Sequence, residues 1–425
     1  MDTSIQLKYG NSNVAVTLPS TNLLGIFEPS ALPPLTNMVE DLHQSMMHPL
    51  SRPPLDEIVK PNEKIVILID DHTRGTPTAL ILPEVIQVLH QANVPDHNIT
   101  IMITHGTHRL CSEDEVKQKV GEEIYQQYTI VQHRCDDEEN QVYLGITQRG
   151  TPVWINRIVV EADKRIGIGH IGPSPYAGYS GGLKLIVPGV ASLDTINANH
   201  SMVPVGFRKA GAVDIPTRQD IDEAAAMVGI DFLIDVVLDR EDRAIKFFTG
   251  DPNVVYQQGV ALAKQVFEVA LPQPVDIAIT SAYPYDLDLY QGVRAVEYAD
   301  SVVKEGGSIL LIAALPEGWG DEEFHQLMKD RTKTPQHFLR DINRRNGKVT
   351  FNVLGYNLAR IKQEKNLFIF TQGIPASELE EAGFNCTDNL QQGIEKLLEK
   401  HGANSQVAVF PIGSASVSKI QSLLP

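Results

Sequence analysis

The sequence is poor in cysteine and contains no long hydrophobic run. Its 425 residues include three cysteines, Cys111, Cys135 and Cys386, which lie far apart. This spacing excludes a disulfide framework and a CxxC metal site, and it suits a reducing compartment. No uninterrupted apolar stretch is long enough to span a bilayer, and the N-terminus has no charged-then-apolar region. We therefore expect a cytoplasmic protein with no membrane partner.

Positive charge is also scarce. The chain has 36 Lys and Arg residues against 53 Asp and Glu residues, so its formal net charge is −17 at pH 7. This balance argues against nucleic acid as a partner, and an anionic substrate would need a locally basic pocket. The overall composition is that of an ordinary globular protein, and the length suggests two or three domains.

One glycine-rich stretch, residues 167–192, reads GIGHIGPSPYAGYSGGLKLIVPGVAS. Gly178, Gly181 and Gly182 let the backbone approach a ligand closely, and Lys184 follows directly. A glycine-rich turn that enters a helix presents backbone N–H groups and typically binds phosphate. The stretch is not a P-loop, because leucines flank the lysine where a glycine and a Ser or Thr are required. The alternative is an ordinary connection with a solvated lysine.

Polar residues follow two predicted strands in the first half of the chain. Residues 64–70 (KIVILID) and 99–104 read as buried strands, with a helix over 79–93 between them. The segments that follow these strands are 71–74 (DHTR) and 105–109 (HGTHR). In α/β folds, ligands bind beyond the carboxyl ends of parallel strands, so both segments should face one crevice.

A second α/β series begins after residues 271–274 (LPQP), a plausible hinge. We expect strands over 276–280, 308–313, 349–353, 367–370 and 407–410, with helices over 290–305, 321–329, 335–346 and 390–401. The prediction is therefore two α/β domains with an interdomain cleft. Residues 1-270 form the N-terminal cofactor-binding domain, and residues 271-425 form a Rossmann-like C-terminal domain.

The first half also offers candidate acid–base and anion-binding groups. His105 and His108 lack the spacing of a zinc-protease HExxH motif, but an imidazole at a strand end is a natural general base. A structural histidine is the alternative for either one. Arg74 could clamp a carboxylate or phosphate through two hydrogen bonds, with Asp71 orienting it or a neighbouring imidazole. A surface salt bridge is the alternative for this pair.

In the second half, Tyr290, Gln291 and Arg294 begin a predicted helix. Tyr290 and Arg294 lie one turn apart on one face and could grip an anionic substrate. The solvated face of any helix could look the same.

Together these motifs resemble the lactate racemase family, whose enzymes carry the nickel-pincer nucleotide. The resemblance covers nearly the whole chain, in the family's order and with similar spacing. The matching motifs are DDHTR at 70–74, HGTHR at 105–109, GYSGGLKLIVPG at 178–189, His200, and YQGVR at 290–294.

The resemblance implies a covalently bound cofactor. Lys184 matches the lysine that carries pyridinium-3-thioamide-5-thiocarboxylic acid mononucleotide, and His200 matches the one protein ligand of its nickel. Sulfur and imidazole donors in a tetragonal arrangement suit Ni(II). Cofactor-synthesis enzymes are implied as partners. The loop residues expected to contact the cofactor are Gly172, Ser180, Gly181 and Gly182.

The resemblance also implies the chemistry. A base removes the hydroxyl proton of a small 2-hydroxy acid while hydride leaves C2 for the cofactor, and return of hydride to the other face inverts the centre. His108 matches the base, Arg74 the carboxylate-binding arginine and Asp71 its acidic companion. Gln291 and Tyr290 match positions that line the cleft.

Three departures concern the substrate. Ser174 stands where better-known members have a second catalytic histidine, and His170, Tyr176, Tyr179 or a water could replace it. Arg294 stands where the family has a lysine. After Trp319 there is no further tryptophan to line the pocket.

We therefore expect a racemase or epimerase that acts on a 2-hydroxy acid other than lactate. Two alternatives remain open. One is an oxidoreductase that uses the same cofactor without inversion, and the other is a protein that binds a mononucleotide or the cofactor without turnover.

Overall fold

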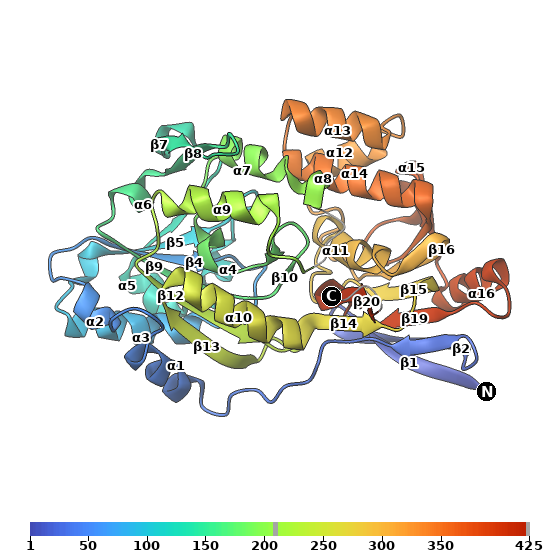
Figure 1. The fold of residues 1–425 in the computed structure, drawn as a ribbon, viewed down its shortest axis with the longest axis horizontal. Coiled ribbons are helices and arrows are strands. Elements are labelled where there is room, and N and C mark those ends of the chain that lie inside the picture. The colour runs from blue at the N-terminus through green and yellow to red at the C-terminus, as the bar shows by residue number, and fades with distance from the viewer. Residues whose placement is uncertain (207–210, 422–425) are drawn as a thin grey trace. The chain divides into compact units, whose positions relative to one another are not determined.

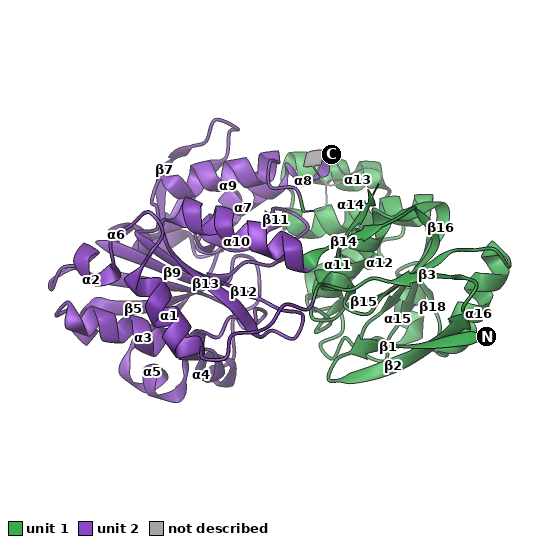
Figure 2. Ribbon diagram, turned by 60° about the horizontal axis from the view of Figure 1, so that its bottom comes forward, with its two compact units in different colours: residues 1–30, 207–211, 267–425 green, residues 31–206, 212–266 purple. Residues whose placement is uncertain are grey.

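The computed structural model describes residues 1–206 and 211–421 and divides into two compact units (Figure 2). Unit 2 comprises residues 31–206 and 212–266, and unit 1 comprises residues 1–30, Gly211 and the chain from Phe267 onward. Both units are α/β, as the sequence predicts. Each unit has its own six-stranded sheet and its own hydrophobic core.

Unit 2 is built on a six-stranded sheet in the order β13-β12-β9-β4-β5-β6 (Figure 1). All neighbours are parallel except β12 and β13, which are antiparallel. Every residue of β4 is buried, as expected of a central parallel strand covered on both faces. The bounds are β4 Ile65–Asp70, β5 Ile99–Thr104, β6 Thr129–Gln132, β9 Lys164–His170, β12 Phe232–Leu238 and β13 Ala244–Gly250.

Helices and short hairpins complete unit 2. The helices are α1 Met38–Met47, α2 Leu55–Ile58, α3 Thr78–Gln91, α4 Glu113–Val120, α5 Glu122–Gln127, α6 Arg157–Glu161, α7 Leu193–His200, α8 Val203–Gly206, α9 Pro216–Ala226 and α10 Pro252–Phe267. The hairpins pair β7 Gln141–Ile146 with β8 Pro152–Asn156, and β10 Pro173–Ser174 with β11 Gly178–Tyr179. Short 3-10 turns are η1 Asp96–Asn98, η2 Glu138–Asn140 and η3 Gly182–Leu185.

Unit 1 is built on a six-stranded parallel sheet in the order β18-β17-β16-β15-β19-β3. The strands are β3 Leu23–Ile26, β15 Val275–Ser281, β16 Val303–Ile312, β17 Asn366–Phe370, β18 Asn385–Cys386 and β19 Val407–Phe410. The helices are α11 Leu289–Asp300, α12 Glu322–Lys329, α13 Pro335–Arg344, α14 Val349–Glu364, α15 Ala376–Glu381 and α16 Leu390–His401. Smaller elements are the hairpin β1 Asp2–Tyr9 with β2 Ser12–Pro19, the pair β14 Glu268–Leu271 with β20 Val417–Ile420, and η4 Gly413–Ala415.

The division into units differs from the predicted domains 1-270 and 271-425 at the N-terminus. The first 30 residues belong to unit 1, because β3 pairs in parallel with β19 and extends the sheet of unit 1. The β1–β2 hairpin buries Ile5, Leu7, Val16 and Leu18 in the same core. Long-range strand pairing of this kind leaves no local signal in the sequence.

The strand predicted over residues 349–353 is wrong. These residues begin α14, most of whose positions are buried. A short apolar run is compatible with a buried strand or a buried helix, and periodicity alone does not separate the two.

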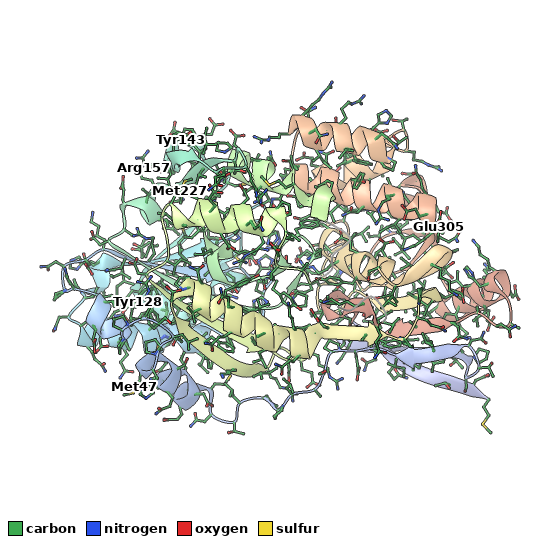
Figure 3. The ribbon with its side chains drawn as sticks, viewed as in Figure 1. Met47, Tyr128, Tyr143, Arg157, Met227 and Glu305 are labelled. Carbon is green, nitrogen blue, oxygen red and sulfur yellow. The ribbon has the colours of Figure 1, made fainter. Side chains whose placement is uncertain are left out.

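A few large apolar side chains are exposed, and Figure 3 labels Tyr143 and Met227 among them. Tyr143 of β7 is 47% exposed and Met227 is 38% exposed. Among the residues that the structure describes, no helix has the length and apolar character needed to cross a membrane.

The buried sheet of unit 1 generates a stability prediction. Ile279 of β15 is 1% exposed, whereas Ile26 of β3 is 47% exposed. We expect Ile279→Ala to lower the free energy of unfolding by about 2–5 kcal/mol, because it leaves a cavity, and Ile26→Ala to lower it much less. Buried Trp319 reports on unit 1 when Trp154, the other of the two tryptophans, is replaced by Phe. Equal shifts of the urea midpoint in both alanine variants would contradict this assignment of the core.

Candidate active site

The polar segments after β4 and β5 meet at one edge of the sheet of unit 2. The two strands pair in parallel register, with Asp70 opposite Thr104. Their carboxyl ends therefore lie side by side, and the residues that follow come into contact. The prediction that both segments face the same place is confirmed by a hydrogen bond between His108 Nδ1 and Asp71 Oδ2 of 2.7 Å.

Buried Asp71 and half-buried His108 form an acid–base pair. The Asp71 side chain is 3% exposed and that of His108 is 21% exposed. Burial alone would raise the pKa of Asp71, but the charge and hydrogen bond of His108, with the charge of Arg74, hold this pKa well below its usual range. A carboxylate only accepts hydrogen bonds, so Nδ1 of His108 carries a proton; in the neutral form of the ring, Nε2 carries the lone pair. This tautomer leaves Nε2 as the basic nitrogen.

His105 is the structural histidine of the segment. Its Nε2 lies 2.9 Å from Gln132 Oε1, and burial, as the main cause, lowers its pKa to about 4. Its Nδ1 lies 3.8 Å from the Asp71 carboxylate. The buried and hydrogen-bonded His105 fits the alternative of a structural histidine, and the role of His108 as a base stays a prediction.

Arg74 is held beside Asp71 through Thr73. The Thr73 N–H and hydroxyl donate to Asp71 Oδ1 at 3.0 and 2.5 Å, and Arg74 Nη1 donates to Thr73 Oγ1 at 2.8 Å. The Lys119 ammonium donates to the Arg74 carbonyl at 2.9 Å. These hydrogen bonds hold the segment after β4 in place, and they fix the position of the Arg74 backbone and of one guanidinium nitrogen.

The glycine-rich stretch forms a tight turn whose polar groups are partly used within the protein. Gly181 and Gly182 have φ angles of +81° and +61°. A Cβ on Gly181 would lie 2.7 Å from Asp235 Oδ2, and the Gly182 N–H donates to the same oxygen at 2.7 Å. The residues after Gly181 form the 3-10 turn η3 rather than the predicted start of an α-helix. The Gly182 N–H is therefore not offered to a phosphate.

Lys184 lies on η3 and points toward Ser174. Its Nζ donates to Ser174 Oγ at 3.2 Å, and Ser174 pairs with Gly178 in the β10–β11 hairpin. The structure thus brings together the predicted attachment lysine and the serine that stands in place of the second histidine.

His200 ends helix α7 and is held as a neutral imidazole. Its Nδ1 donates to the Ile196 carbonyl at 2.9 Å, which directs the lone pair to Nε2. Burial, as the main cause, lowers the pKa of His200 to about 4, and the positive charges of Lys184 and His108 lower it further. A neutral imidazole with its other nitrogen hydrogen-bonded is the form that binds a metal.

Ser180 and Gly172 are engaged with each other. The Ser180 hydroxyl accepts from the Gly172 N–H at 2.9 Å and lies 3.0 Å from the His170 carbonyl. Both residues brace the turn after β9. Their expected contact with a cofactor stays a prediction.

Tyr290, Gln291 and Arg294 form a separate group at the start of α11 in unit 1. The ring of Tyr290 meets Phe351 edge-on at 5.3 Å, and the Arg294 guanidinium lies 4.0 Å from the centre of the Tyr285 ring. The Gln291 side chain is buried and its Nε2 donates to Asp288 at 3.3 Å. Its Oε1 accepts no hydrogen bond from the residues that the structure describes. Their contact with a substrate stays a prediction.

Two buried aspartates support the site and were missed by sequence reasoning. Asp220 accepts hydrogen bonds from Thr147, Thr151 and Asn199, and through Asn199 it anchors the last turn of α7. Asp235 holds the glycine turn. The sequence did carry a signal for Asp235, since an acidic residue interrupts the apolar run FLIDVVL of β12.

The fold and this geometry define an α/β enzyme with its acid–base groups at the carboxyl edge of a parallel sheet. Two family models narrow this class: the Lactate racemase N-terminal domain matches residues 9–210, and the Lactate racemase C-terminal domain matches residues 271–418. The chain therefore belongs to the lactate racemase family. At the level of the family it is a racemase, which is an isomerase.

Individual relatives agree with this assignment. A lactate racemase of Thermoanaerobacterium thermosaccharolyticum is 31% identical over 346 residues, which cover 80% of each chain. One of Lactiplantibacillus plantarum is 28% identical over 98% of this chain and 100% of its own. The structure of the lactate racemase apoprotein from the first organism has a TM-score of 0.90 at 26% identity, covering 98% of this chain and all of its own. A crystal structure of a Thermotoga maritima protein, 18% identical over 91% of this chain and 99% of its own, has a TM-score of 0.74 and shows the same fold.

The buried Asp235 generates a pH prediction. Burial, as the main cause, raises the pKa of Asp235 to about 7, against about 3.9 in an unfolded chain. A raised folded pKa gives a stability contribution that is present below about pH 4 and is lost as the pH rises through about 7. We therefore expect the stability of the wild type relative to Asp235→Asn to fall by about 1.4 kcal/mol per pH unit across this window.

Urea unfolding at pH 5 and pH 8 measures this difference, with Trp154 as the reporter of unit 2 in a Trp319→Phe background. The Asn side chain can still accept the Gly182 N–H. A difference between the two proteins that does not depend on pH would contradict the buried, proton-binding carboxyl.

Proposed function

We propose that this chain inverts C2 of a 2-hydroxy acid other than lactate, using a nickel-pincer nucleotide attached to Lys184. The observation that carries the proposal is the half-buried His200, whose hydrogen bond from Nδ1 to the Ile196 carbonyl leaves the Nε2 lone pair for a metal, with the charge of Lys184 acting on the same ring. Small 2-hydroxy acids and the cofactor-synthesis enzymes are the proposed partners.

The residues of unit 2 fit the proposed cofactor. A single neutral imidazole is a poor nickel site alone, so a cofactor that supplies its own sulfur and carbon donors accounts for His200 as the sole protein ligand. When bound, the cofactor supplies the acceptor for hydride from C2. Lys184 supplies an amine for attachment, and Gly181 and Gly182 keep side chains away from the turn before it.

In this proposal His108 Nε2 accepts the proton of the substrate hydroxyl. Asp71 holds the imidazole in the required tautomer and stabilises the imidazolium that forms, the role that a buried carboxylate plays beside a catalytic histidine. Arg74 binds the substrate carboxylate, because its guanidinium offers two parallel donors and is held beside Asp71 through Thr73.

Three side chains are candidates for the second-face proton in place of a histidine at 174. Tyr179 is fully buried, and His170 Nδ1 is engaged by Asp70 and Thr76 at 3.3 and 3.2 Å. Tyr176 is half-buried, and its ring lies 6.0 Å from that of His200 in an edge-on arrangement. We therefore propose Tyr176 as the second-face group.

Because Ser174 carries no imidazole, an oxidoreductase that acts on one face of C2 without inversion is the alternative function. An enzyme with one strong base oxidises or reduces on one face, and such a protein would form a 2-keto acid without inversion. Chiral analysis of the product separates the two functions, because only a racemase yields the opposite enantiomer of the starting acid.

The cofactor assignment predicts separate roles for two residues. When the chain is made together with the cofactor-synthesis enzymes, Lys184→Ala should abolish the covalent mass adduct. His200→Ala should keep the adduct but lose nickel. Intact mass and nickel analysis check both outcomes, with His97→Ala, an exposed histidine of unit 2, as the control. An adduct that survives Lys184→Ala would refute the attachment site.

The base assignment predicts a large loss of rate. His108→Ala should reduce turnover by about 10²–10⁴-fold while the adduct and nickel content stay unchanged, since loss of a positioned acid–base group costs this much. Asp71→Asn should lower kcat more than it changes KM. Near-normal turnover in His108→Ala would assign the base elsewhere.

The substrate side predicts poor activity on lactate. A screen of 2-hydroxy acids should give slow racemisation of lactate by the wild type and faster turnover of a bulkier or more hydroxylated acid, because serine leaves more room than histidine at 174. On that acid, Tyr176→Phe should slow inversion more than Ser174→Ala does. Rapid lactate racemisation, or complete loss of activity in Ser174→Ala, would overturn this prediction.

A further inference from the structure

We propose that His72, Cys111 and Glu115 form a second metal site, for a zinc-type divalent ion, apart from the proposed nickel ligand His200. The three side chains come from the segments that follow β4 and β5, and one donor atom of each lies within 4.8 Å of the other two. The site does not depend on the proposed racemase chemistry.

The sulfur and imidazole are already spaced as a tetrahedral ion requires. Cys111 Sγ lies 3.3 Å from His72 Nδ1. Metal–sulfur and metal–nitrogen bonds of about 2.3 and 2.0 Å at the tetrahedral angle separate the two donors by about 3.5 Å. An ion could therefore replace the hydrogen bond between them with little movement. Binding would displace the thiol proton, which is released to solvent.

Glu115 can contribute an oxygen at the loss of one hydrogen bond. One of its carboxylate oxygens lies within 4.8 Å of the donor atoms of His72 and Cys111, but Oε1 is 3.8 Å from His72 Nε2, so the carboxylate has to rotate toward the Nδ1 side to share the ion. In its present position Oε1 accepts from Arg109 Nη2 at 2.8 Å. Its Oε2 accepts from the Ser112 N–H at 2.7 Å and from Arg109 Nη1 at 2.8 Å. If Oε1 turned to a metal, Oε2 would keep both of its bonds and the N-terminus of α4 would stay capped.

Charge and burial favour a cation at this place. The negative charges of Asp71 and Glu115 act on both His72 and Cys111, opposed by Arg109. A thiolate and a carboxylate neutralise a divalent ion, which limits the desolvation cost. Cys111 is 6% exposed, the His72 side chain 10% and that of Glu115 26%, so the three donors are largely shielded from solvent and Glu115 is the most accessible of them.

The position of the site gives it a consequence. His72 follows Asp71 directly, and Cys111 lies three residues after His108. A bound ion would link the segment that carries Asp71 and Arg74 to the segment that carries His108, in addition to the hydrogen bond between Asp71 and His108. We therefore infer a metal that positions the acid–base pair and takes no part in hydride transfer.

The test uses Co²⁺ as a spectroscopic probe on the full chain made without the cofactor-synthesis enzymes. A His200→Ala background removes the proposed nickel ligand. We expect one Co²⁺ per chain with a thiolate-to-cobalt charge-transfer band. Cys111→Ser should abolish the band, and His72→Ala and Glu115→Gln should each weaken binding by about tenfold or more, since loss of even an outer-shell partner costs that much.

Cys135→Ser and His97→Ala are the matched controls, and both should bind as the parent does. A band that survives Cys111→Ser, or is lost equally in Cys135→Ser, would overturn the proposal, as would the absence of any band.

A measurement without substitution guards against misfolding: Zn²⁺ should protect Cys111, and not Cys135, from alkylation in peptide mass maps. Equal labelling with and without Zn²⁺ would also refute the site. Neither readout depends on racemase activity, so failure of the metal site and failure of the proposed function are distinguishable.

Discussion

Parallel pairing of β4 with β5 and β9 is the constraint on which the site of unit 2 depends. Parallel strands end at the same edge of a sheet, so the segments after β4, β5 and β9 emerge together although nearly 100 residues separate β4 from β9 in the chain. Asp71 meets His108 across the first pair. The stretch that carries Lys184 reaches the same region, because the Gly106 N–H of the segment after β5 donates to the Gly189 carbonyl at 3.1 Å.

Burial sets the protonation of these groups, and their neighbours decide the direction of each shift. Asp71 stays ionised because His108 and Arg74 outweigh the cost of burial, whereas Asp235 has a weaker set of partners and its pKa rises to about 7. His200 donates to a carbonyl, and burial lowers its pKa to about 4, so it stays neutral. The same unit thus holds an ionised carboxylate at Asp71, a carboxyl that binds a proton near pH 7 at Asp235 and a neutral imidazole at His200. Shifted pKa values of this kind are typical of functional sites.

Much of this arrangement follows from the sequence, and the remainder depends on tertiary contacts. The buried strands β4 and β5 and the meeting of Asp71 with His108 follow from apolar runs and from the geometry of parallel strands. The placement of residues 1–30 depends on a strand pair nearly 400 residues apart in the chain, and α14 began with an apolar run that is ambiguous between strand and helix. The 3-10 turn at Lys184 depends on Asp235, whose hydrogen bond to Gly182 no local pattern predicts.

In the proposed function, hydrogen leaves C2 as hydride and returns to the same carbon, while His108 accepts only the hydroxyl proton. The most direct test is turnover, in ordinary water, of a 2-hydroxy acid substrate that carries deuterium at C2. The account predicts that the inverted product keeps its deuterium. Loss of the label to solvent at the rate of inversion would contradict it, because a base would then be removing a proton from C2.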